Sequence, residues 1–317
     1  MPRSLDTTDL VITQMMLADC RRPDVEVAKF LELGEDEVNR RIASLREDGI
    51  VRDFVARIPP SHLRAVNVFI FGTSEISSLK EAREKLGKND SSSWIGLAAG
   101  SRIYVGATLR RLIHLDSYVV FLREELGMTD LTFGIRSGLP RVHEERPSLD
   151  SLDYRILASL RRDARKSLFE VGREIGEDRT VVEARVHRMR EEGAVEFSIE
   201  LDPEATSDII CMIHLWRRGR GELKPFMRDK LNEHSPHILF FNQYRNLTDL
   251  TMAMCWVPDM SQLRAILRSF QSRDDFYHVE ANPLLTSCNL EDWADRLILE
   301  RSKGADGSTT ERPQEVA

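Results

Sequence analysis

One stretch of this sequence combines small and basic side chains at a spacing suited to contacting nucleic acid. Read at a helical period, residues 178–192 place Val182, Val186 and Met189 on one stripe, so that face belongs in a core. The opposite face and its edge are small and basic enough to enter a DNA groove. Its candidate DNA-contacting residues are Arg179, Thr180, Ala184, His187 and Arg188.

The residues just upstream supply the element that would position this helix. Residues 168–175 (LFEVGREI) predict a second, shorter helix, and Gly176-Glu177 predicts a tight turn between the two. This is the pattern of a helix-turn-helix. Arg165 and Lys166 lie in the turn before the shorter helix, where they could neutralise DNA phosphates.

The same pattern occurs 144 residues earlier, because residues 5–59 align with residues 149–203 without a gap. The alignment keeps the apolar core positions and the terminating glycine, so it predicts a tandem duplication. Arg40 and Arg41 are the candidate DNA contacts of the first copy. Three acids, at 35–37, open its third helix and would repel phosphate there, so we expect this copy to bind DNA more weakly.

Composition limits the possible functions. The 317 residues suggest two or more domains, and no apolar run reaches the length of a membrane helix, so a soluble cytoplasmic protein is expected. The four cysteines form no paired-ligand motif, and neither a metal site nor a cofactor is predicted. The net charge is −7, so DNA binding must come from a local patch, in a homo-oligomer that adds several patches, and must be salt-dependent.

The coarse secondary structure predicts four domains of an α+β protein. Two winged helix-turn-helix domains, at 1–60 and 149–203, alternate with two domains of β-α-β-β-α-β order, at 61–136 and 204–288. That order is the ferredoxin-like unit, whose sheet leaves one face uncovered by helices, so the two units could pair within the chain. The remaining segments are a linker at 137–148, a C-terminal helix at 289–303 and a tail at 304–317 expected to be disordered.

The boundaries expected for individual elements follow from periodicity and turn residues. Gly34 is assigned to the turn of the first helix-turn-helix, because glycine tolerates backbone angles that other residues resist. The closing strand of the second ferredoxin-like unit is expected at 276–281. Wings are expected at 50–58 and 196–202, and the second is acidic.

The segment from Leu149 to Val195 resembles the DNA-binding segment of the Lrp/AsnC family of transcriptional regulators. The Leu-Asp opening, the Asp-Ala-Arg-Lys turn and the Arg-x-x-x-x-Arg-x-x-Gly close carry the resemblance. That family pairs a helix-turn-helix with a ferredoxin-like ligand and oligomerisation domain, called RAM. The resemblance implies a DNA-binding regulator, modulated by an amino-acid-like effector and assembled through RAM-type domains. Arg245-Asn246 stands where the first unit has its Gly100 turn, so an effector pocket does not carry over directly.

Two other functions remain open. Siroheme decarboxylases resemble tandem or paired Lrp/AsnC-like units, but they depend on a His-Asn-Tyr-x-Arg type segment, and residues 241–245 (FNQYR) lack that histidine. A ligand-sensing or oligomerisation module that does not touch DNA would suit the acidic balance. No phosphate loop, HExxH or GxSxG is present, and His234-Ser-Pro-His237 reads as a loop, so no catalytic residue is predicted.

Overall fold

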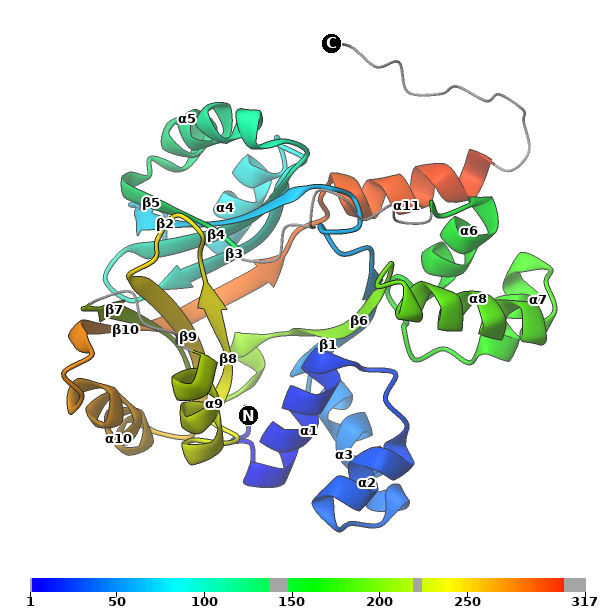
Figure 1. Ribbon diagram of the computed structural model, residues 1–317, viewed down its shortest axis with the longest axis horizontal. Coiled ribbons are helices and arrows are strands. Elements are labelled where there is room, and N and C mark those ends of the chain that lie inside the picture. The colour runs from blue at the N-terminus through cyan, green and yellow to red at the C-terminus, as the bar shows by residue number, and fades with distance from the viewer. Residues whose placement is uncertain (1, 137–147, 219–223, 305–317) are drawn as a thin grey trace.

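The computed structural model describes residues 2–136, 148–218 and 224–304 (Figure 1). The expected linker, apart from Ser148, and the expected tail, apart from Gly304, lie outside these residues. In the part of the chain that is described, no helix combines the length and apolar character needed to cross a membrane.

Two units of three helices and a strand lie on one side of the molecule (Figure 1). The first comprises α1 (Thr7–Ala18), α2 (Asp24–Leu31), α3 (Glu35–Glu47) and β1 (Val51–Arg57). The second comprises α6 (Ser151–Leu160), α7 (Leu168–Ile175), α8 (Arg179–Glu191) and β6 (Glu196–Leu201). Aspartates at equivalent positions begin α1 and α6, since the side chains of Asp6 and Asp150 each accept a backbone N–H from the first turn.

The remaining elements follow the β-α-β-β-α-β order twice. The first set is β2 (Val66–Thr73), α4 (Leu79–Leu86), β3 (Ser92–Ala98), β4 (Arg102–Leu109), η1 (Leu112–His114), α5 (Leu115–Leu126) and β5 (Thr129–Ile135). After η2 (Pro203–Ala205), the second set is β7 (Ile209–Arg217), α9 (Lys224–Glu233), β8 (Ile238–Gln243), β9 (Leu250–Val257), α10 (Met260–Gln271) and β10 (Phe276–Asn289). The final helix, α11 (Trp293–Lys303), packs against α6.

All described strands of these two sets form one antiparallel sheet in the order β5-β2-β4-β3-β10-β7-β9-β8. The strand expected at 276–281 continues to Asn289, so the predicted end was wrong. Beyond Pro283, β10 leaves β7 and pairs with β3, from Leu284 opposite Ala98 to Asn289 opposite Trp94. The extension joins the halves because it gives β3, otherwise an edge strand, a hydrogen-bonded partner.

The inner faces of the two half-sheets share one core. Phe71 and Tyr104 of the first half contact His214 of the second, with ring centroids 4.8 and 5.7 Å apart. Helices α4 and α5 cover the outer face of the first half, and α9 and α10 that of the second (Figure 1). The internal pairing of the two faces expected from the sequence is therefore present, and it removes apolar surface from water.

The strands expected as wings do not form wings of their own. Instead β1 pairs with β6 in an antiparallel ribbon, with Phe54 opposite Ile199 and Arg57 opposite Glu196. A lone strand after each helical unit would leave its backbone N–H and C=O groups unpaired. β1 and β6 satisfy these groups by pairing with each other. The acidic segment at 196–202 is thus mainly an inter-unit contact rather than a groove-binding wing.

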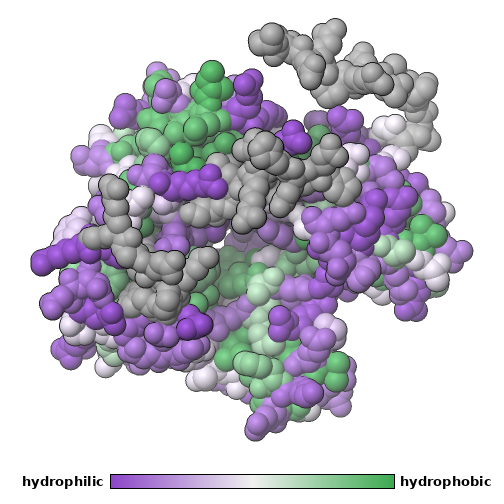
Figure 2. All heavy atoms as spheres, viewed as in Figure 1, coloured by the Kyte–Doolittle hydropathy of each residue, from purple (hydrophilic) through white to green (hydrophobic). Residues whose placement is uncertain are grey.

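The surface of the molecule is mostly hydrophilic on the face drawn in Figure 2. Hydrophobic residues gather over α5 and in a hollow between the sheet and the two helical units. The ribbon of β1 and β6 lies between those units and connects them to the sheet (Figure 1).

Candidate nucleic-acid interface

The second helical unit has a tightly built turn before α8. Ser167 and Glu170 form a reciprocal capping box at the start of α7, a signal readable as S-x-x-E. Gly176 ends α7 in the left-handed conformation, with φ of +72°. Gly172 faces the turn so closely that a Cβ would lie 2.6 Å from the carbonyl oxygen of Glu177. These residues fix the direction in which α8 leaves the turn.

Four of the predicted DNA contacts lie together on the exposed face of α8. Thr180, Ala184 and His187 are exposed. Arg179 is 63% exposed, and its Nε donates to Oε1 of Glu183 at 2.6 Å. Exposed i,i+4 pairs of this kind are weak, so the guanidinium can exchange its partner for a phosphate or a base edge. The first turn of α8 carries no acidic residue.

Arg188 does not share the exposed face, contrary to its assignment from the sequence. Its Nη2 donates to Oδ2 of Asp153, whose carboxylate is fully buried. Arg185 reaches the other oxygen of Asp153 at 3.4 Å and Oδ2 of Asp150 at 2.5 Å. A buried carboxylate needs such compensation. Arg188 therefore stabilises the helical unit instead of projecting from it.

Arg165 and Lys166, the predicted phosphate contacts, are both held in contacts within the protein. Arg165 Nη2 contacts both carboxylate oxygens of Asp24, at 2.7 and 2.6 Å, and its Nη1 donates to the carbonyl of Cys20 at 3.2 Å. Lys166 pairs with Glu174 at 2.9 Å. A bidentate arginine–carboxylate contact is among the stronger polar contacts, and here it joins the two helical units.

The equivalent arginine of the first unit makes the reciprocal contact. Arg21 Nη1 donates to the carbonyl of Ala164 at 2.5 Å and to that of Lys166 at 3.0 Å. Arg21 and Arg165 stand 144 residues apart, as the internal alignment requires. The turn that each contributes is thus an inter-unit contact repeated by approximate two-fold symmetry.

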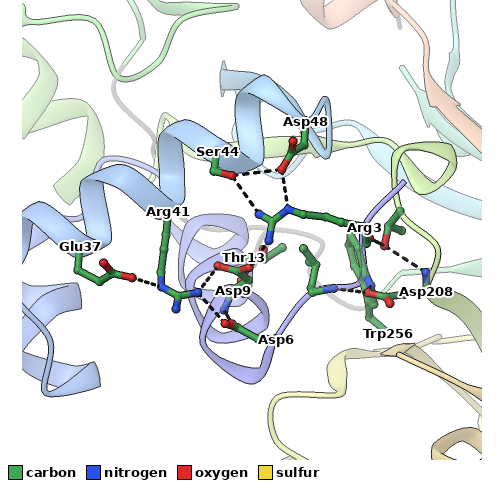
Figure 3. Close-up of polar contacts among 12 residues, drawn as sticks. Arg3, Asp6, Asp9, Thr13, Glu37, Arg41, Ser44, Asp48, Asp208 and Trp256 are labelled. Atoms are coloured by element: carbon green, nitrogen blue, oxygen red, sulfur yellow. Dashed lines mark hydrogen bonds and ion pairs between the residues drawn. The ribbon is translucent and has the colours of Figure 1, made fainter. Parts of the chain in front are cut away.

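In the first unit, Arg41 is held inside the unit and Arg40 is exposed. Arg41 Nη1 lies 2.8 Å from carboxylate oxygens of both Asp6 and Asp9, and its Nε is 2.7 Å from Glu37 (Figure 3). Burial raises the pKa of Asp6, but hydrogen bonds from Asp9 N–H and from Arg41 outweigh burial and bring it below its usual value. Arg40 is 73% exposed and pairs with Glu37.

Arg3, which was not among the predicted functional residues, fills the place that Arg188 has in the second unit. Its guanidinium bonds to Asp9 at 2.8 Å, to Asp48 at 2.5 Å and to Ser44 at 3.4 Å (Figure 3). Ser44 is the residue aligned with Arg188. The internal alignment could have indicated this role. Asp9 aligns with Asp153, but Ser44 replaces Arg188, so Asp9 needs a second arginine from elsewhere.

The turn of the first unit differs from that of the second. The left-handed residue is Glu32, with φ of 55°, at the position of Gly176. Gly34 lies in the turn as predicted, but it is the N-cap of α3 with an ordinary φ of −74°, so the backbone freedom of glycine is not what places it there. Ala28 replaces Gly172. The first unit therefore reaches a similar arrangement without either glycine.

Known proteins resemble this chain in the second helical unit and in its fold. Residues 149–190 match the AsnC-type helix-turn-helix domain family. An uncharacterised HTH-type transcriptional regulator of Pyrococcus furiosus is 30% identical over 135 residues, which are 42% of this chain and 87% of that protein. This chain belongs to the Lrp/AsnC family of transcriptional regulators.

Other relatives of this Lrp/AsnC protein match smaller parts or the fold alone. The regulator LrpA of Pyrococcus horikoshii is 35% identical over 83 residues, which are 26% of this chain and 59% of that protein. The crystal structure of the siroheme decarboxylase NirDL has a TM-score of 0.58 and 12% identity, covering 95% of this chain and all of that chain. At 12% identity, the similarity to the siroheme decarboxylase shows a shared fold and does not assign its activity to this chain.

Proposed function

We propose that this Lrp/AsnC regulator is a tandem protein that reads DNA with one face of α8. The observation that carries the proposal is the group Arg179, Thr180, Ala184 and His187, exposed together on a helix that follows a tight helix-turn-helix turn. A helix presenting small and basic residues can approach base edges in the major groove.

The tandem organisation is supported by the alignment at an offset of 144 residues and by the repeated order of elements. In this proposal the DNA-binding domains are 1–60 and 149–203, and the ferredoxin-like RAM-type domains are 61–136 and 204–288. The linker at 137–148, the C-terminal segment at 289–303 and the tail at 304–317 complete the organisation; the helix expected over 289–303 begins only at Trp293, because β10 runs to Asn289. The β1–β6 ribbon and the shared core make one chain the equivalent of a dimer.

The first unit contributes less to DNA contact. Glu35, Asp36 and Glu37 occupy the first turn of α3, where α8 has no acid. Carboxylates there oppose a phosphate approaching the helix N-terminus. Two α8 helices would then come from two copies of the chain, which is why we infer a homo-oligomer on DNA.

The test is DNA binding by the full chain across a salt series, with fragments of its own upstream region. Arg179→Ala should weaken specific binding by about 1–3 kcal/mol if Arg179 contacts a base, or flatten the salt dependence if it contacts phosphate. The matched control is Arg40→Ala, an exposed and similarly ion-paired arginine on α3, which should have the smaller effect. Equal losses in the two variants would refute a reader confined to α8.

A siroheme-decarboxylase-like activity is the second candidate, favoured by the likeness of fold over nearly the whole chain. The corresponding segment, FNQYR at 241–245, opposes it, since Phe241 stands where a His-Asn-Tyr-x-Arg segment has its histidine. Two other residues of this segment are buried and hydrogen-bonded within the protein. Asn242 Oδ1 accepts from Arg136 at 2.8 Å, and the Tyr244 hydroxyl donates to Sδ of Met252 at 2.9 Å. Titration with an iron-uroporphyrin III analogue should give no Soret shift; a saturable shift would favour this candidate.

We also propose that a small-molecule effector modulates DNA binding. The support is architectural: the sheet and both DNA-binding units meet at the β1–β6 ribbon, so a ligand at that junction would change how the units are held. Comparing DNA affinity with and without candidate ligands measures the coupling.

A further inference from the structure

A cleft lined by five arginines lies where the ribbon, α4, α6 and the start of α11 meet. It has a volume of about 230 Å³. Arg52 and Arg57 come from β1, Arg83 from α4, and Arg161 and Arg162 from the end of α6. Guanidinium groups from three elements far apart in the sequence therefore converge on one cleft.

The side chains lining the cleft carry an excess of positive charge. Five arginines face three carboxylates, those of Glu200, Glu291 and Asp295, so the lining carries a net charge of 5 − 3 = +2. Like charges held close together repel one another unless an anion lies between them. Asp202 and Asp53, outside the lining, pair with two of these arginines, so a dianion would bind by sharing or replacing these carboxylates.

Carboxylates orient four of the arginines without using all their donors. Arg57 pairs with Glu200 and Arg161 with Glu291, while Arg52 and Arg162 pair with Asp202 and Asp53, which do not line the cleft. Each of these ion pairs engages one terminal nitrogen, and a guanidinium has five N–H donors. The remaining donors are pre-positioned, which lowers the entropic cost of binding an anion.

Arg83, like Arg52 and Arg162, is exposed. It lies in the last turn of α4, and its guanidinium, unlike the other four, is not placed in an ion pair by the described contacts. Arg162 is 57% exposed and its contact with Asp53 is long, at 3.3 Å. These two side chains can rearrange around a ligand at little cost.

The neighbouring cavity limits how large the anion can be. It has a volume of about 370 Å³ and shares Arg57, Leu290 and Asp295 with the arginine cleft, but it also presents Glu196 and Asp292. Burial raises the pKa of Glu196, and burial together with Asp295 raises the pKa of Asp292 to about 6. The three carboxyl groups that line this cavity outnumber its two arginines, Arg57 and Arg136, so a compact anion is favoured at the arginine end.

We propose that this cleft binds a compact dianion, either a phosphate group or a small dicarboxylate, and that its occupancy fixes the second helical unit relative to the sheet. A bound dianion would bridge β1, α4 and α6, which belong to the ribbon, the first half-sheet and the second helical unit respectively. The binding step stands by itself. The regulatory consequence rests on the proposed function, because it acts through the position of α8.

Calorimetric titration of the full chain with inorganic phosphate, and separately with succinate, tests the binding step. The wild-type protein should bind at least one of them with 1:1 stoichiometry, and the two titrations distinguish phosphate from dicarboxylate. Arg83→Ala/Arg162→Ala should weaken binding about tenfold or more, since each substitution removes charge-assisted donors. The matched control, Arg123→Ala/Arg264→Ala, removes two exposed arginines outside the cleft and should bind as wild type does.

Three results would overturn the site: no binding of either dianion, equal binding by both double variants, or equal binding of chloride. Arg83→Lys/Arg162→Lys, which keeps the charge, should retain part of the affinity and shows that folding is not the cause of loss. DNA titrations with and without the bound dianion test regulation separately. An unchanged DNA affinity would overturn the coupling, whereas absence of DNA binding under all conditions would overturn the proposed function and leave the calorimetric result standing.

Discussion

At the scale of single residues, burial separates arginines that look alike in the sequence. Arg179 and Arg188 are both basic residues of α8, yet one is exposed and the other neutralises Asp153. Arg185 repeats in the second unit the contacts that Arg41 makes in the first. The buried aspartates Asp9 and Asp153 engage arginines of their own units, and only the remaining arginines are available for DNA.

Arg188→Ala should destabilise the protein by about 1–3 kcal/mol, because it leaves the buried Asp153 carboxylate with too few partners. Chemical denaturation monitored by circular dichroism measures the free energy of unfolding. Arg179→Ala, on the exposed face, should change it by less than about 0.5 kcal/mol. If Arg188→Ala unfolded like wild type but lost DNA binding, Arg188 would be a reader after all.

His214 gives the stability of the fold a predictable pH dependence. Its Nε2 lies 2.9 Å from the Tyr104 hydroxyl, and its Nδ1 lies 3.7 Å from Glu280. Burial lowers the pKa of His214 from 6.5 to about 4, outweighing the opposing influence of Glu280. Below pH 6.5 the unfolded chain takes up a proton that the folded chain does not. Stability should therefore fall by up to about 3 kcal/mol between pH 6.5 and 4.

Melting temperatures measured between pH 7.5 and 4.5 check this. His214→Gln should lower the melting temperature at pH 7.5, through loss of packing, and should flatten the decline below pH 6.5. His187→Gln, at an exposed histidine, should leave the decline unchanged. A decline as steep in His214→Gln as in wild type would assign it to other groups.

At the scale of elements, the two helix-turn-helix units share an order of helices but use different turns. Gly172 and Gly176 allow close approach and a left-handed residue in the second unit, where Ala28 and Glu32 serve in the first. The apolar periodicity of each helix was sufficient to predict its buried face, with Val182, Val186 and Met189 all buried as expected. The turn of the first unit was mispredicted because a residue other than glycine occupies the left-handed position.

Gly172→Ala should destabilise the second unit by about 1–3 kcal/mol, because the added methyl group would lie 2.6 Å from the Glu177 carbonyl oxygen. Gly34→Ala is a useful control, since no atom lies within 4 Å of a Cβ there and its φ is ordinary. Thermal unfolding of both variants measures the difference. Equal melting temperatures would show that the turn adjusts without cost.

At the scale of the whole molecule, the two halves depend on one another for their strand partners. The β10 extension pairs with β3 of the first half, and β1 pairs with β6 of the second. The N-terminal segment also crosses between halves: Leu5 N–H donates to Asp208 at 2.9 Å, and Trp256 Nε1 donates to the same oxygen at 2.8 Å (Figure 3). Each half alone would expose unpaired strands and an apolar sheet face.

Residues 1–148 and 149–317 expressed separately should therefore be poorly soluble, and co-expression should recover a complex of the two. Size-exclusion chromatography with light scattering measures this, and applied to the intact chain it also gives the number of subunits. Two fragments that each remained soluble, folded and monomeric would contradict the mutual dependence of the halves.

The order of helices and strands, the buried face of each helix and the relation between the two copies could all be predicted from the amino-acid sequence. These features depend on periodicity and on turn residues, which act over a few positions. It was also sufficient to identify the α8 face of Arg179, Thr180, Ala184 and His187 as a candidate interface, because exposure on a helix follows from the same periodicity.

Which basic residues remain exposed depends on contacts between units that are far apart in the sequence. The Arg165–Asp24 contact joins residues 141 positions apart, and the β1–β6 and β3–β10 pairings join the two copies. Ion pairs and strand partners of this kind depend on how whole units pack, and no local spacing encodes them. For the same physical reason, no sequence motif predicts the cleft that five arginines from separate elements form.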